Sequence, residues 1–184
     1  ILATHMNGLS APMDELEALC QAHPHPQYGP LKVICDAARA GGAKYKGTRV
    51  GKRGWMTVHS FHTMKMMTTL GEGGMITTDD DDVARRARSH RAFGAGEPLW
   101  GTNYRMTRLQ AAVGLVQLRR LDGMNSLRRD RAQKLTELLR GIPELTLPSE
   151  PAGYYHIYYG YTVMVPEHWA GEGRQRLMEW LQAE

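Results

Sequence analysis

The sequence predicts an α/β fold with a mainly parallel β-sheet, and two observations lead to this prediction. Short apolar segments typical of strands alternate with segments of helical periodicity through the first part of the chain. Such alternation is typical of strands joined by crossover helices, which makes neighbouring strands parallel. A length of 184 residues, with 42% hydrophobic and 23% charged residues, suits one globular domain, or one domain and part of a second. The expected strands cover residues 1–4, 31–35, 55–61 and 75–78.

Helices are expected between and after these strands. The first begins near Pro12, which fits a first helical turn, and Ser10 can cap it. The proline-rich segment 23–30 then predicts a loop. The next helix follows the acidic run 79–82, because carboxylates favour the positive end of the helix dipole, and it ends before Gly94.

The second half of the chain predicts two further helices, then strands and a last helix. Apolar side chains recur at helical spacing in both helices, and glycine and proline follow the second. The expected helices cover 107–121, 126–139 and 174–182, and the expected strands cover 145–147 and 158–165.

Hydropathy, cysteine and charge patterns narrow the class of protein. Apolar runs are only a few residues long, whereas a membrane helix needs about 20, and no signal-peptide pattern opens the chain. The two cysteines form no spaced disulfide framework, so we expect a cytoplasmic protein with no membrane partner. The net charge of +4 tolerates an anionic ligand. The arginines of segment 119–131 alternate with acids and lack interleaved aromatics, so we expect no nucleic-acid partner.

Asp36 is the first candidate site residue. It stands at the carboxyl end of the apolar segment 31–35, which is where α/β folds bind their ligands. A carboxylate in this position can contact a ligand, or it can cap a helix over 37–40. The position alone does not decide between the two interpretations.

Lys65 is the second candidate. Met64, Met66 and Met67 flank it, and lysine is rarely buried among apolar residues without a function. Burial favours the neutral amine, a nucleophile able to form a Schiff base. Ser60 and nearby threonines supply hydroxyls suited to a phosphate. The alternative is a lysine in an ordinary surface loop.

The histidines do not predict a metal site. His59 and His62 are three residues apart, and His23 and His25 lie in the proline-rich loop. No cysteine pair and no HExxH pattern accompanies them, so we expect no bound metal.

Several segments, in order along the chain, resemble one enzyme family. The run from Ser60 to Gly74 resembles the active-site lysine segment of the DegT/StrS sugar aminotransferases, which are pyridoxal-phosphate enzymes with the aspartate-aminotransferase fold, fold type I. Residues 33–38 resemble the strand that ends in the pyridinium-binding aspartate, and residues 45–51 resemble the turn that follows it. Residues 103–115 resemble the loop and helix that lead to the small domain, and residues 158–163 resemble its first long strand.

The resemblance implies a role for each candidate. Lys65 would bind pyridoxal 5′-phosphate through a Schiff base and shuttle the proton of transamination, and Asp36 would pair with the pyridine nitrogen. Ser60 would hydrogen-bond the phosphate. Asn103 would reach the phosphate of the partner subunit's cofactor across a homodimer interface. Arg39 replaces a glutamine common in relatives near the cofactor's phenolic oxygen, where a guanidinium can stabilise the negative charge.

Two further departures from the family concern Gly41 and the chain length. Gly41 stands where relatives commonly carry histidine. Relatives are also much longer, so the chain is expected to be an internal fragment. Residues 1–122 would be the second half of the cofactor-binding large domain, and residues 123–184 would be a connecting helix and the beginning of a small α+β domain.

The resemblance therefore implies a transaminase that moves an amino group from glutamate or glutamine to a keto sugar, expected to be nucleotide-linked. Amination of a keto-cyclitol is the alternative within the family. A cofactor-free binding or regulatory module is the alternative outside catalysis. The sequence names neither the sugar nor the carbon that receives the amino group.

Overall fold

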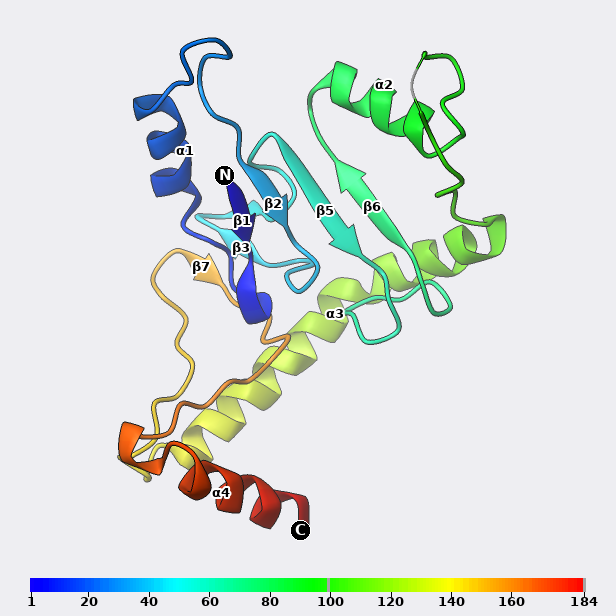
Figure 1. The fold of residues 1–184 in the computed structure, drawn as a ribbon. Coiled ribbons are helices and arrows are strands. Elements are labelled where there is room, and N and C mark those ends of the chain that lie inside the picture. Colours follow the sequence, from blue (N-terminus) through cyan, green and yellow to red (C-terminus); the bar gives the residue numbers. More distant parts are fainter. Residues whose placement is uncertain (99, 184) are drawn as a thin grey trace.

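The computed structural model describes residues 1–98 and 100–183 (Figure 1). Its main sheet has the strand order β1–β2–β5–β6. Strands β1, β2 and β5 are parallel, whereas β6 runs antiparallel to β5. The predicted α/β fold with a mainly parallel sheet is confirmed. The four strands are β1 (Leu2–Thr4), β2 (Ile34–Asp36), β5 (Met56–Ser60) and β6 (Gly74–Thr77).

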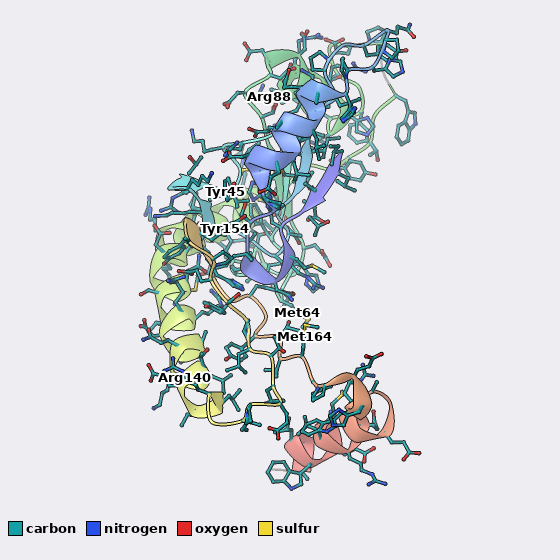
Figure 2. All side chains as sticks on the ribbon, turned by 90° about the vertical axis from the view of Figure 1, so that its left-hand side faces the viewer. Tyr45, Met64, Arg88, Arg140, Tyr154 and Met164 are labelled. Atoms are coloured by element: carbon teal, nitrogen blue, oxygen red, sulfur yellow. The ribbon has the colours of Figure 1, made fainter. Side chains whose placement is uncertain are left out.

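A second, smaller antiparallel sheet was not predicted. It has the order β4–β3–β7 and joins β3 (Lys44–Tyr45), β4 (Thr48–Arg49) and β7 (Tyr154–Tyr155). The rings of Tyr45 and Tyr154 meet edge to face with centroids 4.8 Å apart, and both are labelled in Figure 2. This pairing brings the chain after residue 150 back beside the residues that follow β2.

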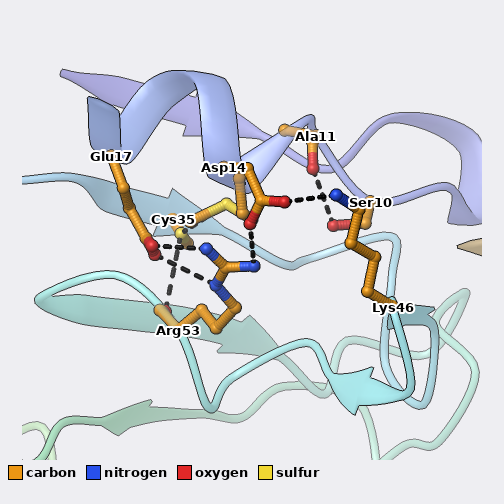
Figure 3. A network of polar contacts seen from close by, with 8 residues as sticks. Ser10, Ala11, Asp14, Glu17, Cys35, Lys46 and Arg53 are labelled. Atoms are coloured by element: carbon orange, nitrogen blue, oxygen red, sulfur yellow. Dashed lines mark hydrogen bonds and ion pairs between the residues drawn. The ribbon is translucent and has the colours of Figure 1, made fainter. Parts of the chain in front are cut away.

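Helix α1 (Met13–Ala22) begins where the sequence predicts, but Ser10 does not cap it. The Ser10 hydroxyl instead donates to the carbonyl of Ala11 at 2.9 Å. Polar contacts fix α1 to the loop before β5 (Figure 3): Arg53 donates to Asp14 at 2.6 Å and to Glu17 at 3.2 Å. Beneath the helix lies a buried apolar cluster of Ala3, Met13, Cys20, Val33, Cys35 and Tyr45.

Helix α2 (Asp81–His90) confirms the prediction from the acidic run. The side chain of Asp80 caps it by accepting a 3.0 Å hydrogen bond from the Val83 amide. Gly94 follows the helix with a φ of 80°, and its amide donates to the carbonyl of Ser89.

Helix α3 (Arg108–Leu139) is one continuous helix, so the prediction of two separate helices is wrong. Gly123 in a helix interior costs about 1 kcal/mol relative to alanine, but tertiary contacts on both sides hold the helix there. Asp122 pairs with Arg49 at 2.7 Å, and the buried Asn125 donates to the Gly41 carbonyl at 3.0 Å. Gly42 (φ 91°) must lack a side chain, because a Cβ there would lie 2.4 Å from the Asn125 amide nitrogen. The helix also runs through the expected domain boundary between residues 122 and 123.

The strands predicted after α3 are not formed. Residues 145–147 and 158–165 share only an isolated bridge between Thr146 and Met164. Tyr158 has a φ of 47°, which is left-handed and ends any strand. The last helix, α4 (Glu172–Ala183), confirms its prediction and lies beyond the C-terminal end of α3 (Figure 1). Over the described residues, no helix combines the length and apolar character needed to cross a membrane.

Candidate active site

The candidate site lies at the carboxyl edge of strands β2 and β5. The two strands are parallel neighbours, and Asp36, the last residue of β2, is in register with Val58. The Ala37 amide donates to the Val58 carbonyl at 2.8 Å, which ties the turn after β2 to β5. Ser60 ends β5 two residues later, and the loop carrying Lys65 starts there. The parallel pairing therefore delivers the carboxylate and the lysine loop to one edge of the sheet.

Asp36 caps a turn, not a helix. Its Oδ1 accepts a 2.9 Å hydrogen bond from the Ala38 amide, and residues 37–40 are not helical. Among the described residues no other side-chain hydrogen bond or ion pair reaches this half-buried carboxylate. The expectation of a helix cap over 37–40 is thus wrong: one oxygen holds a turn, and the second oxygen stays available to a ligand.

The buried His5 follows β1 and the half-buried His59 lies on β5, the two strands that flank β2. Burial lowers the pKa of His5 to about 4, although the negative charge of Asp36 acts in the opposite direction. The Nδ1 of His5 accepts a 2.9 Å hydrogen bond from the Ala11 amide. Burial also lowers the pKa of His59 on β5. Both imidazoles are therefore neutral at pH 7 and do not act as cationic partners of Asp36.

The loop that carries Lys65 is closed on itself. The Thr63 amide donates to the Gly71 carbonyl at 2.8 Å, and the Thr69 amide donates to the Phe61 carbonyl at 3.1 Å. The Lys65 amide donates to the carbonyl of His62 at 2.9 Å. These bonds hold the lysine in a defined turn at the end of β5.

An apolar cluster anchors this loop to the turn after Asp36. Burying a side chain such as phenylalanine or methionine contributes about 1.5–3 kcal/mol, so the cluster fixes the two loops relative to each other. Gly41 is packed closely against the same cluster, since an added Cβ there would lie 3.1 Å from the Met66 Cε. The cluster consists of Ala40, Ala43, Phe61, Met66, Met67, Leu121 and Ile157.

The methionines flanking Lys65 do not surround it as predicted. Met66 and Met67 are buried, but Met64 is 75% exposed (Figure 2). Lys65 itself is half-buried. It is therefore neither an ordinary surface lysine nor one enclosed in an apolar pocket.

Arg39 and Lys65 both approach the ring of Tyr159, and Ser60 ends β5, the strand next to that of Asp36. Arg39 Cζ and Lys65 Nζ lie 5.6 Å and 5.4 Å from the centroid of one ring, that of Tyr159. Ser60 is half-buried, and its Oγ accepts a 3.4 Å hydrogen bond from the His62 amide. Four predicted site residues thus stand on two adjacent strand ends.

Asn103 lies apart from these four residues. It is exposed in the connection between α2 and α3, and its Oδ1 accepts a 2.9 Å hydrogen bond from Arg105 Nε. Within the described part of the chain, no hydrogen bond joins it to Asp36, Ser60 or Lys65. Its contribution to the site of a second subunit stays a prediction.

The sheet edge thus holds a strand-end aspartate and, on the next strand, a loop lysine, and a comparison of the whole sequence identifies the family. The model of the DegT/DnrJ/EryC1/StrS aminotransferase family matches residues 1–184. The chain belongs to this family. The resemblance predicted from the lysine segment is confirmed.

Known relatives of this DegT/StrS family member are about twice as long as the chain. It is 35% identical over 173 residues to the "Pleiotropic regulatory protein" of Geobacillus stearothermophilus, a match that covers 91% of the chain and 45% of that relative. DesV of S. venezuelae, solved in complex with a ketimine intermediate, matches with a TM-score of 0.88 and 32% identity over 99% of this chain and 47% of DesV. DesI, solved in the presence of its TDP-sugar product, matches with a TM-score of 0.87 and 29% identity over 100% of this chain and 46% of DesI.

Sequence reasoning missed His5 and Tyr159. His5 directly follows β1, whose end is adjacent to Asp36 in the sheet, so strand order was the signal that could have found it. Tyr159 was assigned to a strand of the small domain. The chain reaches the lysine of this DegT/StrS-family site just after the β3–β7 pairing, which no local pattern predicts.

Proposed function

We propose that the protein is a pyridoxal-phosphate-dependent aminotransferase that moves an amino group from glutamate or glutamine to a nucleotide-linked keto sugar. The observation that carries this proposal is the convergence of Asp36 and the Lys65 loop at the ends of two parallel strands. Membership of the DegT/DnrJ/EryC1/StrS family supports the reaction type. The likeness to DesI, solved with a TDP-sugar product, supports the class of acceptor.

The residues at this sheet edge fit pyridoxal 5′-phosphate. When bound, this cofactor draws electron density away from the carbon that carries the amino group. Asp36 is suited to the protonated pyridine nitrogen because one of its oxygens is left without a partner among the described residues. Ser60 would hold the phosphate, Arg39 would face the phenolic oxygen, and Lys65 would hold the cofactor covalently.

Lys65 would also move the proton of the reaction. Once the donor's amine has displaced it from the cofactor, its Nζ would take the proton from the carbon that carries the amino group and deliver it to the C4′ carbon of the cofactor. The closed loop and the buried Met66 and Met67 fix the backbone from which this amine reaches out. A well-defined amine position favours proton transfer over a fixed, short path.

We also propose a homodimer in the cytoplasm. Asn103 is exposed, and among the described residues it has no hydrogen bond to its own Lys65. Both observations are consistent with a residue that serves the partner's site. Cys20 and Cys35 are free and buried, which suits a reducing compartment.

Two alternatives stand beside this proposal. A keto-cyclitol acceptor would use the same residues. A regulatory role without catalysis is favoured by the name of the Geobacillus relative, a pleiotropic regulatory protein. Catalysis requires that Lys65 bind the cofactor covalently, whereas a purely regulatory module does not.

The test uses the complete product of the gene that encodes this chain. It is incubated with pyridoxal 5′-phosphate, with glutamate or glutamine, and with a panel of keto sugar nucleotides and keto-cyclitols, and products are identified by mass spectrometry. We expect an aminated sugar nucleotide, and none from the Lys65→Arg variant. If no acceptor is aminated and the cofactor does not bind covalently, the result favours the regulatory alternative.

A further inference from the structure

Tyr159 is the shared partner of two cations at the candidate site. Lys65 Nζ lies 5.4 Å from the centroid of its ring and Arg39 Cζ lies 5.6 Å from it. Over residues 1–98 and 100–183, no carboxylate forms an ion pair with either cation. A cation without a carboxylate partner can instead be attracted by the negative face of an aromatic ring.

We propose that Tyr159 is a positioning residue of the Lys65 site, and that it holds Lys65 and Arg39 each in place through a cation–π contact. The proposal deepens the proposed function and rests on it. Stacking on the ring fixes the orientation of the guanidinium while its N–H donors stay free for an oxyanion. The same ring limits the positions of the Lys65 amine.

The backbone before Tyr159 is built to place this ring. Tyr158 has a φ of 47°, a conformation that a tyrosine keeps only where surrounding contacts impose it. Its amide donates to His156 Nδ1 at 3.0 Å, and the two rings stack with centroids 4.0 Å apart and planes 5° apart. Between them, the fully buried Ile157 donates its amide to the Gly8 carbonyl at 3.0 Å. The turn at Tyr158 therefore directs Tyr159 in a way that a continuing strand would not.

An ion pair from α3 holds the same segment. Arg129 donates to the His156 carbonyl at 2.7 Å and to Glu150 at 3.1 Å. Glu150 in turn accepts the His156 amide at 2.7 Å. The segment is thus fixed on one side by α3 and on the other by Gly8, at the end of the 3₁₀ helix η1 (Met6–Gly8). A fixed backbone with a strained tyrosine indicates that the position of Tyr159 matters.

The test measures the reactivity of the two cations in the complete gene product, purified without cofactor. Lys65 is labelled with acetic anhydride and Arg39 with phenylglyoxal, and rates are obtained by peptide mass spectrometry. In Tyr159→Leu both rates should rise about two- to fivefold, because no ring covers or attracts the groups. Tyr159→Phe keeps the ring and should label like the parent protein. Lys44, whose ring partner is Tyr155 at 5.3 Å, is the internal control and should not change.

Three outcomes would overturn the proposal: unchanged rates in Tyr159→Leu, equal effects of leucine and phenylalanine, or an equal rise at Lys44, which would assign Tyr159 to general packing. The visible absorption band of the cofactor-loaded protein gives a second readout, which should shift in Tyr159→Leu and not in Tyr159→Phe. Labelling needs no cofactor, so its outcome does not depend on whether the protein is a transaminase.

Discussion

Asp36 Oδ1 accepts a 2.9 Å hydrogen bond from the Ala38 amide, and this single bond separates the structural role of the carboxylate from its proposed chemical role. The turn after β2 needs one acceptor oxygen. An asparagine supplies the same oxygen without the charge. A substitution can therefore keep the turn and remove only the ion that the pyridine nitrogen would need.

We predict that Asp36→Asn leaves covalent binding of the cofactor almost normal and slows proton removal from the amino donor. The loss is on the order of a thousandfold, or about 4 kcal/mol of barrier, because a neutral amide does not stabilise a protonated ring nitrogen. Single-turnover decay of the absorption band of the lysine-bound cofactor, with glutamate as donor, measures it.

The matched variant Asp36→Ala removes the turn acceptor as well and should also weaken cofactor retention. If Asp36→Asn keeps the single-turnover rate within a few-fold of the parent protein, Asp36 serves the turn alone.

Much of the site follows from sequence because it depends on local order along the chain. The run from Ser60 to Gly74 and the strand ending at Asp36 carry their own patterns. The alternation with helices holds for β1 and β2, which α1 separates, whereas β2 and β5 are parallel without a helix between them. The start of α2 could also be predicted, because Asp80 and the acidic residues after it favour the first turn of a helix.

The parts that sequence reasoning missed depend on contacts between distant segments. Gly123 indicates a helix break by propensity, yet α3 continues through it, with Asp122 paired to Arg49 on one side and Asn125 bonded to Gly41 on the other. The segment 158–165 has strand composition, but the buried Ile157 and the left-handed Tyr158 turn it away from any sheet. Neither the Asp122–Arg49 pair nor the burial of Ile157 can be predicted from local periodicity.

The buried His5 predicts a pH dependence of stability. Its pKa is about 4 in the folded chain and 6.5 when unfolded, so the unfolded state binds more protons between these values. The stabilisation is complete above pH 6.5 and is lost as the pH falls towards 4. Between pH 7 and 4.5 we expect a loss of about 2 kcal/mol from this group, with Asp36 and His59 as the ionisable neighbours.

Chemical denaturation at the two pH values measures this loss, with His5→Asn as the variant. Asparagine offers an oxygen to the Ala11 amide and does not titrate, so its stability should fall by about 2 kcal/mol less than that of the parent protein. His25→Asn, in the exposed proline-rich loop, is the control. An equal loss of stability in the parent and His5→Asn proteins would show that His5 does not cause the destabilisation at low pH.

The contacts of Arg53 predict a second difference in stability. Arg53 is partly buried and binds both Asp14 and Glu17, whereas Lys46 binds only Asp14 and is 61% exposed. Arg53→Met should lower the free energy of unfolding by about 1–3 kcal/mol, and the matched Lys46→Met by less than about 0.5 kcal/mol. Urea denaturation compares the two. Equal losses would mean that the network in Figure 3 does not depend on Arg53.

Asn103 predicts complementation between subunits. If Asn103 serves the partner's site, a heterodimer of Asn103→Ala and Lys65→Ala subunits carries both defects in one site and neither in the other. Mixed dimers should therefore recover close to half of the activity per dimer, although each variant alone is defective. Full activity of a monomer, with Asn103→Ala harmless, would refute the shared site.

Borohydride reduction of the cofactor-loaded, complete gene product tests the central claim most directly. Reduction fixes the cofactor to the lysine that holds it, and peptide mapping by mass spectrometry locates the pyridoxyl group. We expect it on Lys65, the half-buried lysine at the carboxyl edge beside Asp36. A pyridoxyl group on Lys46 or Lys52 in place of Lys65 would contradict the account.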